Sequence, residues 1–178
     1  MAEPAMHTPS LRLQWQRRAT LVRLRVALSA ADAARQRLDL AAPLEARRAG
    51  DCLSLWLGPD QWLLRQEHAP ADALCARIGA RLAGLRHHAV DVSAAMQCVQ
   101  LGGNAARTLL AMGSGIDCSP RGMRPGSCVR TRFARLAVVM HCTGEQAFDL
   151  YFDHSFRAYL DEWLRRAADD PLIARAAN

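Results

Sequence analysis

The amino-acid sequence predicts an α+β fold made of two related half-domains, each with the element order β-α-β-β-α. Apolar and polar residues alternate at 21–28 and again at 148–152, which is typical of half-buried strands. Apolar residues recur at helical spacing over 70–85 and 155–167. Because the same order of elements occurs twice, we expect mixed or antiparallel sheets with helices packed against them.

The first half-domain is expected over residues 19–88. Its first strand, at 21–28, should be followed by a short helix over about 30–38, with Ser29 as the N-cap. A second helix should open at Pro70, because proline is favoured at the first helical position. Apolar residues should line the buried sides of the strand and of the second helix: Val22, Leu24, Val26 and Leu28, then Leu74, Ile78, Leu82 and Leu85.

Between these helices, residues 52–66 predict a β-hairpin around the stretch GPDQWLL. Pro59 presets the backbone of the second turn position, and Asp60 favours the third. Each arm carries a large aromatic residue, Trp56 on one and Trp62 on the other. Three roles are open for the two tryptophans: core packing, a ligand wall, or the contact surface for another protein. They are our candidate interface residues.

The second half-domain is expected over residues 89–168, between an N-terminal tail or edge segment at 1–18 and a C-terminal tail at 169–178. Asn104 should cap its first helix and Ser155 its last. Its strands are expected at 90–92, 96–101, 124–133, 135–142 and 148–152. The repeat is supported by two similar pairs of stretches: DAAR at 32–35 with NAAR at 104–107, and GDCLSLW at 50–56 with GSCVRTRF at 126–133.

The last strand and the last helix have well-defined predicted faces. Along the strand, three residues should point inward and two outward: Phe148, Leu150 and Phe152, then Asp149 and Tyr151. Along the helix, six residues fall at core spacing: Phe156, Tyr159, Leu160, Trp163, Leu164 and Ala167.

Composition limits the classes of function. The net charge is +6 and every basic residue is arginine, which reflects genome composition and also suits protein interfaces, where arginine is enriched. Acidic residues are interspersed with the arginines, so we expect no nucleic-acid partner. The apolar runs are too short for a membrane span, and the first residues do not resemble a secretory signal, so the cytoplasm is the expected location.

Signals for hydrolytic or phosphate chemistry are sparse. Residues 112–117, MGSGID, are glycine-rich but lack the GK[ST] ending of a phosphate loop, so they predict a plain connection from helix to strand. Ser93 and Ser155 are not surrounded by a nucleophile-elbow sequence. Asp91 and Asp117 are isolated acids with no visible partner.

Signals for metal or thiol chemistry are equally sparse. His87 and His88 are adjacent, as are His141 and Cys142, and adjacent side chains cannot face one metal from a regular element. None of the six cysteines forms a CxxC pair, and most lie in strand-like runs, where a reduced cysteine acts as a small buried hydrophobe. Cys128 is a weak candidate nucleophile, because a reactive thiol needs an electropositive, partly exposed setting. We assign no catalytic, cofactor-binding or metal-binding residue to this chain.

Five stretches resemble, in order and spacing, the gamma subunit of heterotetrameric sarcosine oxidase: WLGPDQWLL, AVDVSAAM, VQLGGNAARTLLAMGSGIDC, RPGSCVRTRFARLAVVMH and FDLYFDHSFRAYLDEWL. The resemblance runs from about Trp56 to Leu164. It departs from the family pattern after DVS, where Ala94, Ala95 and Met96 replace the usual His-Ala-Arg. His154 also stands where the family tends to have arginine. That family in turn resembles the folate-binding domain of aminomethyltransferases, which implies the same fold here.

The resemblance implies a non-catalytic structural gamma subunit, partnered by alpha, beta and delta subunits. The complex would oxidatively demethylate sarcosine to glycine, reduce oxygen to hydrogen peroxide and pass the one-carbon unit to tetrahydrofolate. It would carry FAD, FMN, NAD, tetrahydrofolate and zinc in its other subunits, with no cofactor in this chain. The exact substrate stays open, since related complexes demethylate other N-methyl amino acids.

Two other functions remain open from the residues alone. One is a stand-alone folate-binding or aminomethyltransferase-like protein, which would need a folate-contacting carboxylate that we cannot assign to Asp91 or Asp117. The other is a metal- or redox-active cysteine protein. Folate titration and metal analysis of the purified chain distinguish these from the subunit interpretation.

Overall fold

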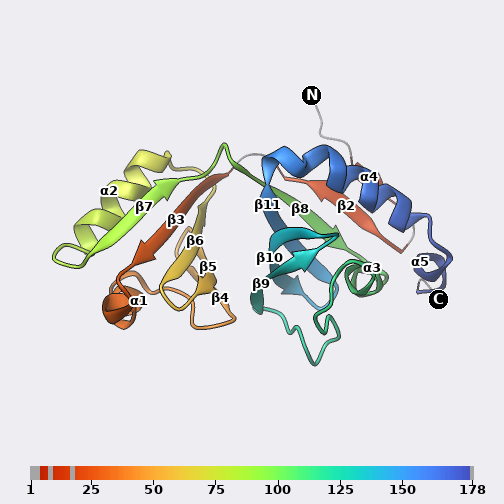
Figure 1. Ribbon diagram of the computed structural model, residues 1–178, viewed down its shortest axis with the longest axis horizontal. Coiled ribbons are helices and arrows are strands. Elements are labelled where there is room, and N and C mark those ends of the chain that lie inside the picture. Colours follow the sequence, from red (N-terminus) through yellow and green to blue (C-terminus); the bar gives the residue numbers. More distant parts are fainter. Residues whose placement is uncertain (1–4, 8–9, 17–18, 177–178) are drawn as a thin grey trace. The chain divides into compact units, whose positions relative to one another are not determined.

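The computed structural model describes residues 5–7, 10–16 and 19–176 (Figure 1). The chain divides into two compact units. The first unit is Arg18–Met96, and the second joins Met1–Arg17 to Gln97–Asn178. Each unit has one sheet and its own helices, so the predicted α+β class is confirmed.

The first unit contains a five-stranded antiparallel sheet with the order β4-β5-β6-β3-β7. Helix α2 packs against β3 and β7. The elements of this unit are β3 (Thr20–Val26), the 3₁₀ turn η1 (Leu28–Ala30), α1 (Ala31–Leu38), β4 (Ala46–Ala49), β5 (Cys52–Gly58), β6 (Gln61–Gln66), α2 (Ala71–Arg81) and β7 (His87–Asp91).

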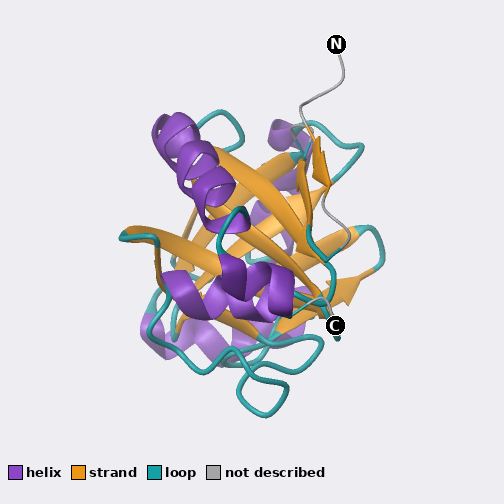
Figure 2. Cartoon of the chain, turned by 90° about the vertical axis from the view of Figure 1, so that its right-hand side faces the viewer, coloured by secondary structure: helices purple, strands orange, loops and turns teal. Residues whose placement is uncertain are grey.

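The second unit contains a six-stranded sheet with the order β1-β2-β8-β11-β10-β9. Its helices line one face of the sheet (Figures 1 and 2). The elements are β1 (Ala5–His7), β2 (Arg12–Trp15), β8 (Met96–Gly102), α3 (Ala106–Gly113), β9 (Cys128–Phe133), β10 (Leu136–Gly144), β11 (Ala147–Asp153), the 3₁₀ turn η2 (His154–Phe156), α4 (Arg157–Ala168) and α5 (Pro171–Arg175).

Each unit has its own hydrophobic core between sheet and helices. In the first unit, the core joins the inward side chains of β3 and β6 to α2, including Leu24, Leu64 and Ile78. In the second unit, side chains of β8, β10 and β11 meet those of α3 and α4, including Leu109 and Leu160. Burying apolar side chains in this way is the main source of stability for such layers.

The repeat is real, but each copy has three strands between its helices rather than two; β4 of the first copy was not expected, whereas the three strands of the second copy were. Both units follow β-α-β-β-β-α, as β3-α1-β4-β5-β6-α2 and as β8-α3-β9-β10-β11-α4. The matched tetrads DAAR and NAAR lie at equivalent helices, and their second alanines, Ala34 and Ala106, are both fully buried. However, GSCVRTRF forms β9, the counterpart of β4, whereas GDCLSLW leads into β5, the counterpart of β10.

The unit boundaries differ from the expected ones because the two copies exchange a strand. The fifth strand of the first sheet is β7, which was expected to open the half-domain 89–168. The equivalent place beside β8 is taken by β2, from the expected tail at 1–18. The expected tail at 169–178 includes α5, whose Ile173 is buried in the core of the second unit.

Three predicted helix caps are wrong. Ser29 lies inside η1, and neither Ala30 before α1 nor Ala105 before α3 caps through its side chain. The first N–H groups donate to backbone carbonyls instead. The N–H of Ala105, for example, donates to the carbonyl of Ser10 at 3.0 Å. At η2 the cap is Asp153, which accepts the N–H of Ser155 at 2.9 Å. Asn104 and Ser155 are therefore not caps.

Pro70 also sits one place earlier than predicted. It is the N-cap residue of α2, and the helix itself begins at Ala71. Three of the four residues assigned to the inward face, Leu74, Ile78 and Leu82, are buried, and Leu85 is partly buried against the same core.

Several predicted faces are also corrected. Leu28 belongs to η1 and is 68 % exposed, because the strand ends before it. Asp149 and Tyr151 are buried rather than outward, since β11 is an interior strand that is buried on both faces. The Tyr151 hydroxyl donates to Asp149 Oδ2 at 3.2 Å, so the two polar groups compensate each other. Alternation alone does not reveal a second buried face.

Among the described residues, no helix is both long and apolar enough to cross a membrane.

Candidate functional site

The predicted hairpin is present, and its two tryptophans have different environments. Trp56 and Trp62 are directly opposite each other in β5 and β6. Trp62 is 2 % exposed and lies in the core of the first unit. Trp56 is half-buried against the same core. Core packing is therefore the role of Trp62, and an interface role for Trp56 remains a prediction.

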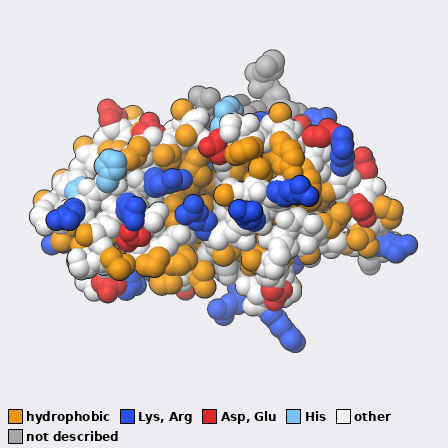
Figure 3. Space-filling model, in the orientation of Figure 1, with side chains coloured by type: hydrophobic (Ala, Val, Ile, Leu, Met, Phe, Trp, Pro, Cys, Tyr) orange, Lys and Arg blue, Asp and Glu red, His pale blue; other side chains and the backbone are white. Residues whose placement is uncertain are grey.

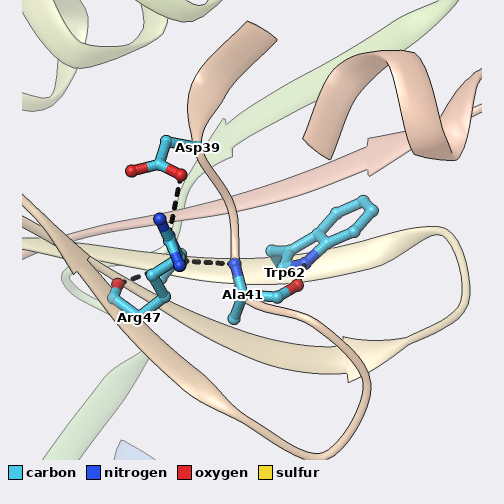
Figure 4. A network of polar contacts seen from close by, with 5 residues as sticks. Asp39, Ala41, Arg47 and Trp62 are labelled. Atoms are coloured by element: carbon cyan, nitrogen blue, oxygen red, sulfur yellow. Dashed lines mark hydrogen bonds and ion pairs between the residues drawn. The ribbon is translucent and has the colours of Figure 1, made fainter. Parts of the chain in front are cut away.

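A polar network fixes Trp62 in place (Figure 4). The indole Nε1–H donates to the carbonyl of Ala41 at 2.9 Å. The N–H of Ala41 donates to Ser54 Oγ at 2.8 Å, and Ser54 Oγ–H donates to the carbonyl of Arg47 at 3.1 Å. Arg47 completes the network with an ion pair to Asp39 at 2.7 Å. Buried indole and hydroxyl groups need such partners, so the network is structural.

The two candidate serines are both held in Asp-x-Ser turns. Ser93 Oγ–H donates to Asp91 Oδ1 at 2.5 Å, and Ser93 Oγ accepts the N–H of Leu21 at 2.9 Å. Ser155 Oγ–H donates to Asp153 Oδ1 at 2.7 Å. The serine hydroxyls hold the pKa of Asp91 and of Asp153 below the ordinary value. These serines donate to carboxylates, so they brace the turns.

The histidine and cysteine candidates are not brought together. His87 and His88 are neighbours on β7, and His87 Nδ1 lies 2.8 Å from the carbonyl of Leu85. Cys128 is only 1 % exposed, which removes the access that a nucleophile needs. Burial raises the pKa of the Cys142 thiol. In the part of the chain that the structure describes, no three His, Cys, Asp or Glu side chains are grouped as a metal would require.

The glycine-rich stretch 112–117 is the predicted connection from α3 to β9. Asp117 accepts the N–H of Ser119 at 2.8 Å, and this bond lowers the pKa of its carboxyl. Arg107 fastens the connection by donating to the carbonyls of Cys118 at 2.6 Å and Met123 at 3.1 Å. A guanidinium with several fixed donors suits this anchoring role.

The surface that sequence reasoning missed lies along α4. Phe156 is 46 % exposed and Tyr159 45 % exposed, although helical spacing predicted both in the core. Trp163, one turn further, is half-buried, and the centroid of its ring lies 4.9 Å from the centroid of the Phe133 ring. Met112 of α3 is also exposed. We call Met112, Phe156, Tyr159 and Trp163 the α4 surface.

The α4 surface is shaped by its neighbours. The Tyr159 hydroxyl donates to the carbonyl of Ala134 at 3.0 Å, so the side chain reaches the β9–β10 turn. Figure 3 shows hydrophobic, arginine and acidic side chains interspersed over the region that α4 occupies in Figure 1. Exposed aromatic residues among arginines are characteristic of protein–protein contact surfaces. Spacing did not separate these residues from Leu160 and Leu164, which occupy the buried side of the helix.

Comparison with known proteins gives a consistent result. Residues 24–170 match the model of the sarcosine oxidase, gamma subunit family. The sarcosine oxidase subunit gamma of Corynebacterium sp. strain U-96 is 32 % identical over 125 residues, which are 69 % of this chain and 59 % of that protein. The subunit gamma from an Arthrobacter species is 29 % identical over 110 residues, 62 % of this chain and 53 % of that protein. The matched part thus spans little more than half of these relatives.

Two solved structures share the fold. A chain of the heterotetrameric sarcosine oxidase from Corynebacterium sp. U-96, in complex with pyrrole 2-carboxylate, matches with a TM-score of 0.80 and 26 % identity, over 94 % of this chain and 86 % of that one. The glycine cleavage system aminomethyltransferase T from Bartonella henselae matches with a TM-score of 0.66 and 14 % identity, over 92 % of this chain and 46 % of that one. The second likeness concerns the fold alone. With a family match over both units, the chain belongs to the sarcosine oxidase gamma subunit family.

Proposed function

We propose that this chain is a non-catalytic structural subunit of a heterotetrameric sarcosine-oxidase-like complex, with alpha, beta and delta subunits as partners. The observation that carries the proposal is the family match over 24–170, which includes both units, together with the TM-score of 0.80 to a chain of a heterotetrameric sarcosine oxidase. The candidate serines and cysteines support a non-catalytic role, since they are turn-bound or buried.

The proposal assigns the chemistry to the complex. Sarcosine is demethylated to glycine, oxygen is reduced to hydrogen peroxide, and the one-carbon unit passes to tetrahydrofolate. FAD, FMN, NAD, tetrahydrofolate and zinc belong to the other subunits in this proposal. All six cysteines lie in the described residues and none of them forms a disulfide, which fits a location in the reducing cytoplasm.

The α4 surface is the proposed contact with a partner subunit. Permanent interfaces bury aromatic and apolar side chains at their centre, and arginine is enriched there. Phe156 and Tyr159 provide the aromatic centre, and the surrounding charges would form the rim. On this proposal the α4 surface is covered in the complex and exposed when the chain is made alone, which predicts self-association of the isolated chain.

Affinity purification of the tagged chain from its native host tests the proposal. We expect two large subunits and a small one to co-purify, as a yellow preparation that releases peroxide with sarcosine. Recovery of the chain alone and colourless, while the partners are expressed, would overturn the proposal. Calorimetric titration of the chain with tetrahydrofolate then decides whether a stand-alone folate-binding protein replaces it.

A further inference from the structure

The first unit contains a cavity of about 210 Å³ that opens between α1, α2 and β5. Its interior is apolar, and its mouth carries charged side chains. We call it the α2 cavity, and its defining residues are Leu40, Leu64, Leu74 and Ile78 inside and Asp39, Asp51, Arg77 and Arg81 at the mouth. All of these residues belong to the first unit, so the cavity does not depend on any partner.

The interior of the cavity suits a small apolar group. Leu64, Leu74 and Ile78 are each at most 2 % exposed and belong to the hydrophobic core. A dry cavity of about 150 Å³ lined by leucine, isoleucine and phenylalanine accepts a benzene ring in another protein. The α2 cavity therefore has room for a body of about one ring.

The mouth presents two arginines from one face of α2. Arg77 and Arg81 are four residues apart in α2, so their side chains project from the same face of the helix. Arg77 Nη2–H donates to Gln66 Oε1 at 2.8 Å. Gln66 is only 2 % exposed, and its Nε2–H donates to Asp51 Oδ2. This buried amide holds Arg77 in one orientation before any ligand arrives.

Arg81 provides the free half of the pair. Within the described residues, its guanidinium takes part in no ion pair or hydrogen bond, although it lines the cavity. Asp39, across the mouth, is paired with Arg47 at 2.7 Å. An anion that enters the mouth can therefore accept hydrogen bonds from the Arg81 guanidinium and from the guanidinium of Arg77, which is already oriented.

The negative charges of the two aspartates favour one class of anion over another. Asp39 and Asp51 flank the mouth, so a doubly charged phosphate would be repelled more strongly than a single carboxylate. A carboxylate also matches the fork of an arginine in a bidentate pair. We propose that the α2 cavity binds a small monocarboxylate with a ring-sized apolar body, its carboxylate on Arg81 and Arg77 and its body on Leu64, Leu74 and Ile78.

Cys52 provides a reporter inside the cavity. It lines the α2 cavity and is half-buried, whereas the half-buried Cys75 does not line it. Burial raises the pKa of both thiols, so alkylation is best followed near pH 8.5. The experiment measures alkylation of each cysteine in the purified full-length chain by mass spectrometry, with benzoate as the probe and benzamide as its neutral counterpart.

We expect benzoate to slow alkylation of Cys52 in a saturable way, while Cys75 is unaffected and benzamide has little effect. Arg81→Ala should raise the benzoate concentration for half-protection about tenfold, and Arg81→Lys should lie between, because a single ammonium keeps the charge but loses the fork. Arg23→Ala, on the exposed side of β3, is the matched control and should behave as wild type.

Three outcomes would overturn the proposal. Cys52 would react at the same rate with and without benzoate, or benzamide would protect as well as benzoate, or Arg81→Ala would leave the half-protection concentration unchanged. Since the assay needs no other subunit, its failure is independent of the assembly experiment, and failure of the assembly experiment leaves the cavity proposal intact.

Discussion

The two units have one topology but differ in how tightly the helices pack. In the second unit, a Cβ placed on Gly113 of α3 would lie 2.5 Å from Phe133, so that layer has no spare room. In the first unit, a Cβ on Gly79 of α2 would meet nothing closer than His87 Nε2 at 3.9 Å. The filled layer presents an aromatic outer surface on α4, and the looser one leaves the α2 cavity.

This difference shows how a duplicated fold can acquire two roles. The strand order that positions the helices is the same in both units. What differs is the side chains between sheet and helix: Phe133 and Trp163 close the gap in the second unit, whereas Leu40 and Leu64 leave it open in the first. Packing, more than topology, separates a contact surface from a candidate binding cavity.

The largest expected effect comes from the exchanged strand β2. Trp15 is 4 % exposed, stacks edge-on to Phe152 at 5.9 Å and lies 3.6 Å from the guanidinium of Arg157. Trp15→Ala should lower the free energy of unfolding by about 3–5 kcal/mol, because it empties a large core site. Hydrogen exchange should show lost protection in β8 and α4, with β3 and α2 nearly unchanged.

The matched control for this change is Trp56→Ala in the first unit. Trp56 is only half-buried, so its removal should cost less and should loosen β5 and β6. Loss of protection in β3 and α2 after Trp15→Ala would contradict the assignment of β2 to the second unit.

A pair of glycine substitutions should have opposite signs in the two units. Gly113→Ala forces the new methyl group into Phe133 and Trp163 and should destabilise the chain by about 1–3 kcal/mol. Gly79→Ala has open space inside a helix and should stabilise it by about 0.5–1 kcal/mol. Denaturant unfolding of the two variants measures both values. If both substitutions changed the free energy of unfolding by the same amount and in the same direction, the two units would be packed alike.

The smallest expected effect concerns acid stability. The Ser93 hydroxyl holds the pKa of Asp91 below its unfolded value of about 3.9, so the stabilisation is present above that pH and is lost as pH falls through the lower folded pKa. Asp91→Asn should therefore be less stable than wild type at pH 7, and the difference should disappear as the pH falls below the folded pKa of Asp91. Stability curves from pH 2 to 7 test this.

The counterpart in the second unit is Asp153→Asn. Its turn partner, Ser155, donates only to Asp153, whereas Ser93 also accepts the N–H of Leu21 and ties β3 to the turn. The loss at pH 7 should therefore be smaller for Asp153→Asn. A larger loss of stability for Asp153→Asn than for Asp91→Asn would show that the bond from Leu21 to Ser93 does not contribute to stability.

Much of the fold follows from local patterns, and the parts that were missed depend on distant residues. The hairpin at Pro59–Asp60 and helices α1 and α2 lie close to their predicted positions, because turn chemistry and helical spacing are local. The exchange pairs β2 with β8, 84 to 90 residues apart, and β7 with β3, 61 to 69 residues apart, and no local pattern encodes it. One of the missed caps also depends on a distant residue, because the N–H of Ala105, just before α3, donates to the carbonyl of Ser10.

The candidate sites show the same limit. The position of a tryptophan in a strand does not reveal whether it is buried or whether its indole has a partner; the 2 % exposure of Trp62 and its bond to Ala41 show that it is core. Phe156 and Tyr159 have the spacing of core residues but lie beyond the edge of the buried stripe. The α2 cavity is lined from residues 38 to 81, so its existence depends on how α1, β5 and α2 converge.

On the proposed function, the α4 surface joins this chain to its partner subunits. It is tested by co-purification of the complex with Phe156→Asp and, as a matched control, Leu28→Asp. Both residues are exposed, at 46 % and 68 %, but Leu28 lies in the other unit. Phe156 is the residue that precedes α4, a position where aspartate is favoured, so the variant should fold.

We expect Phe156→Asp to lower the yield of assembled, flavin-containing complex about thirtyfold, the effect of losing an interface hot spot of about 2 kcal/mol. Leu28→Asp should assemble like the wild type. Full assembly of Phe156→Asp, with loss of assembly in Leu28→Asp, would contradict the account and move the interface to the first unit.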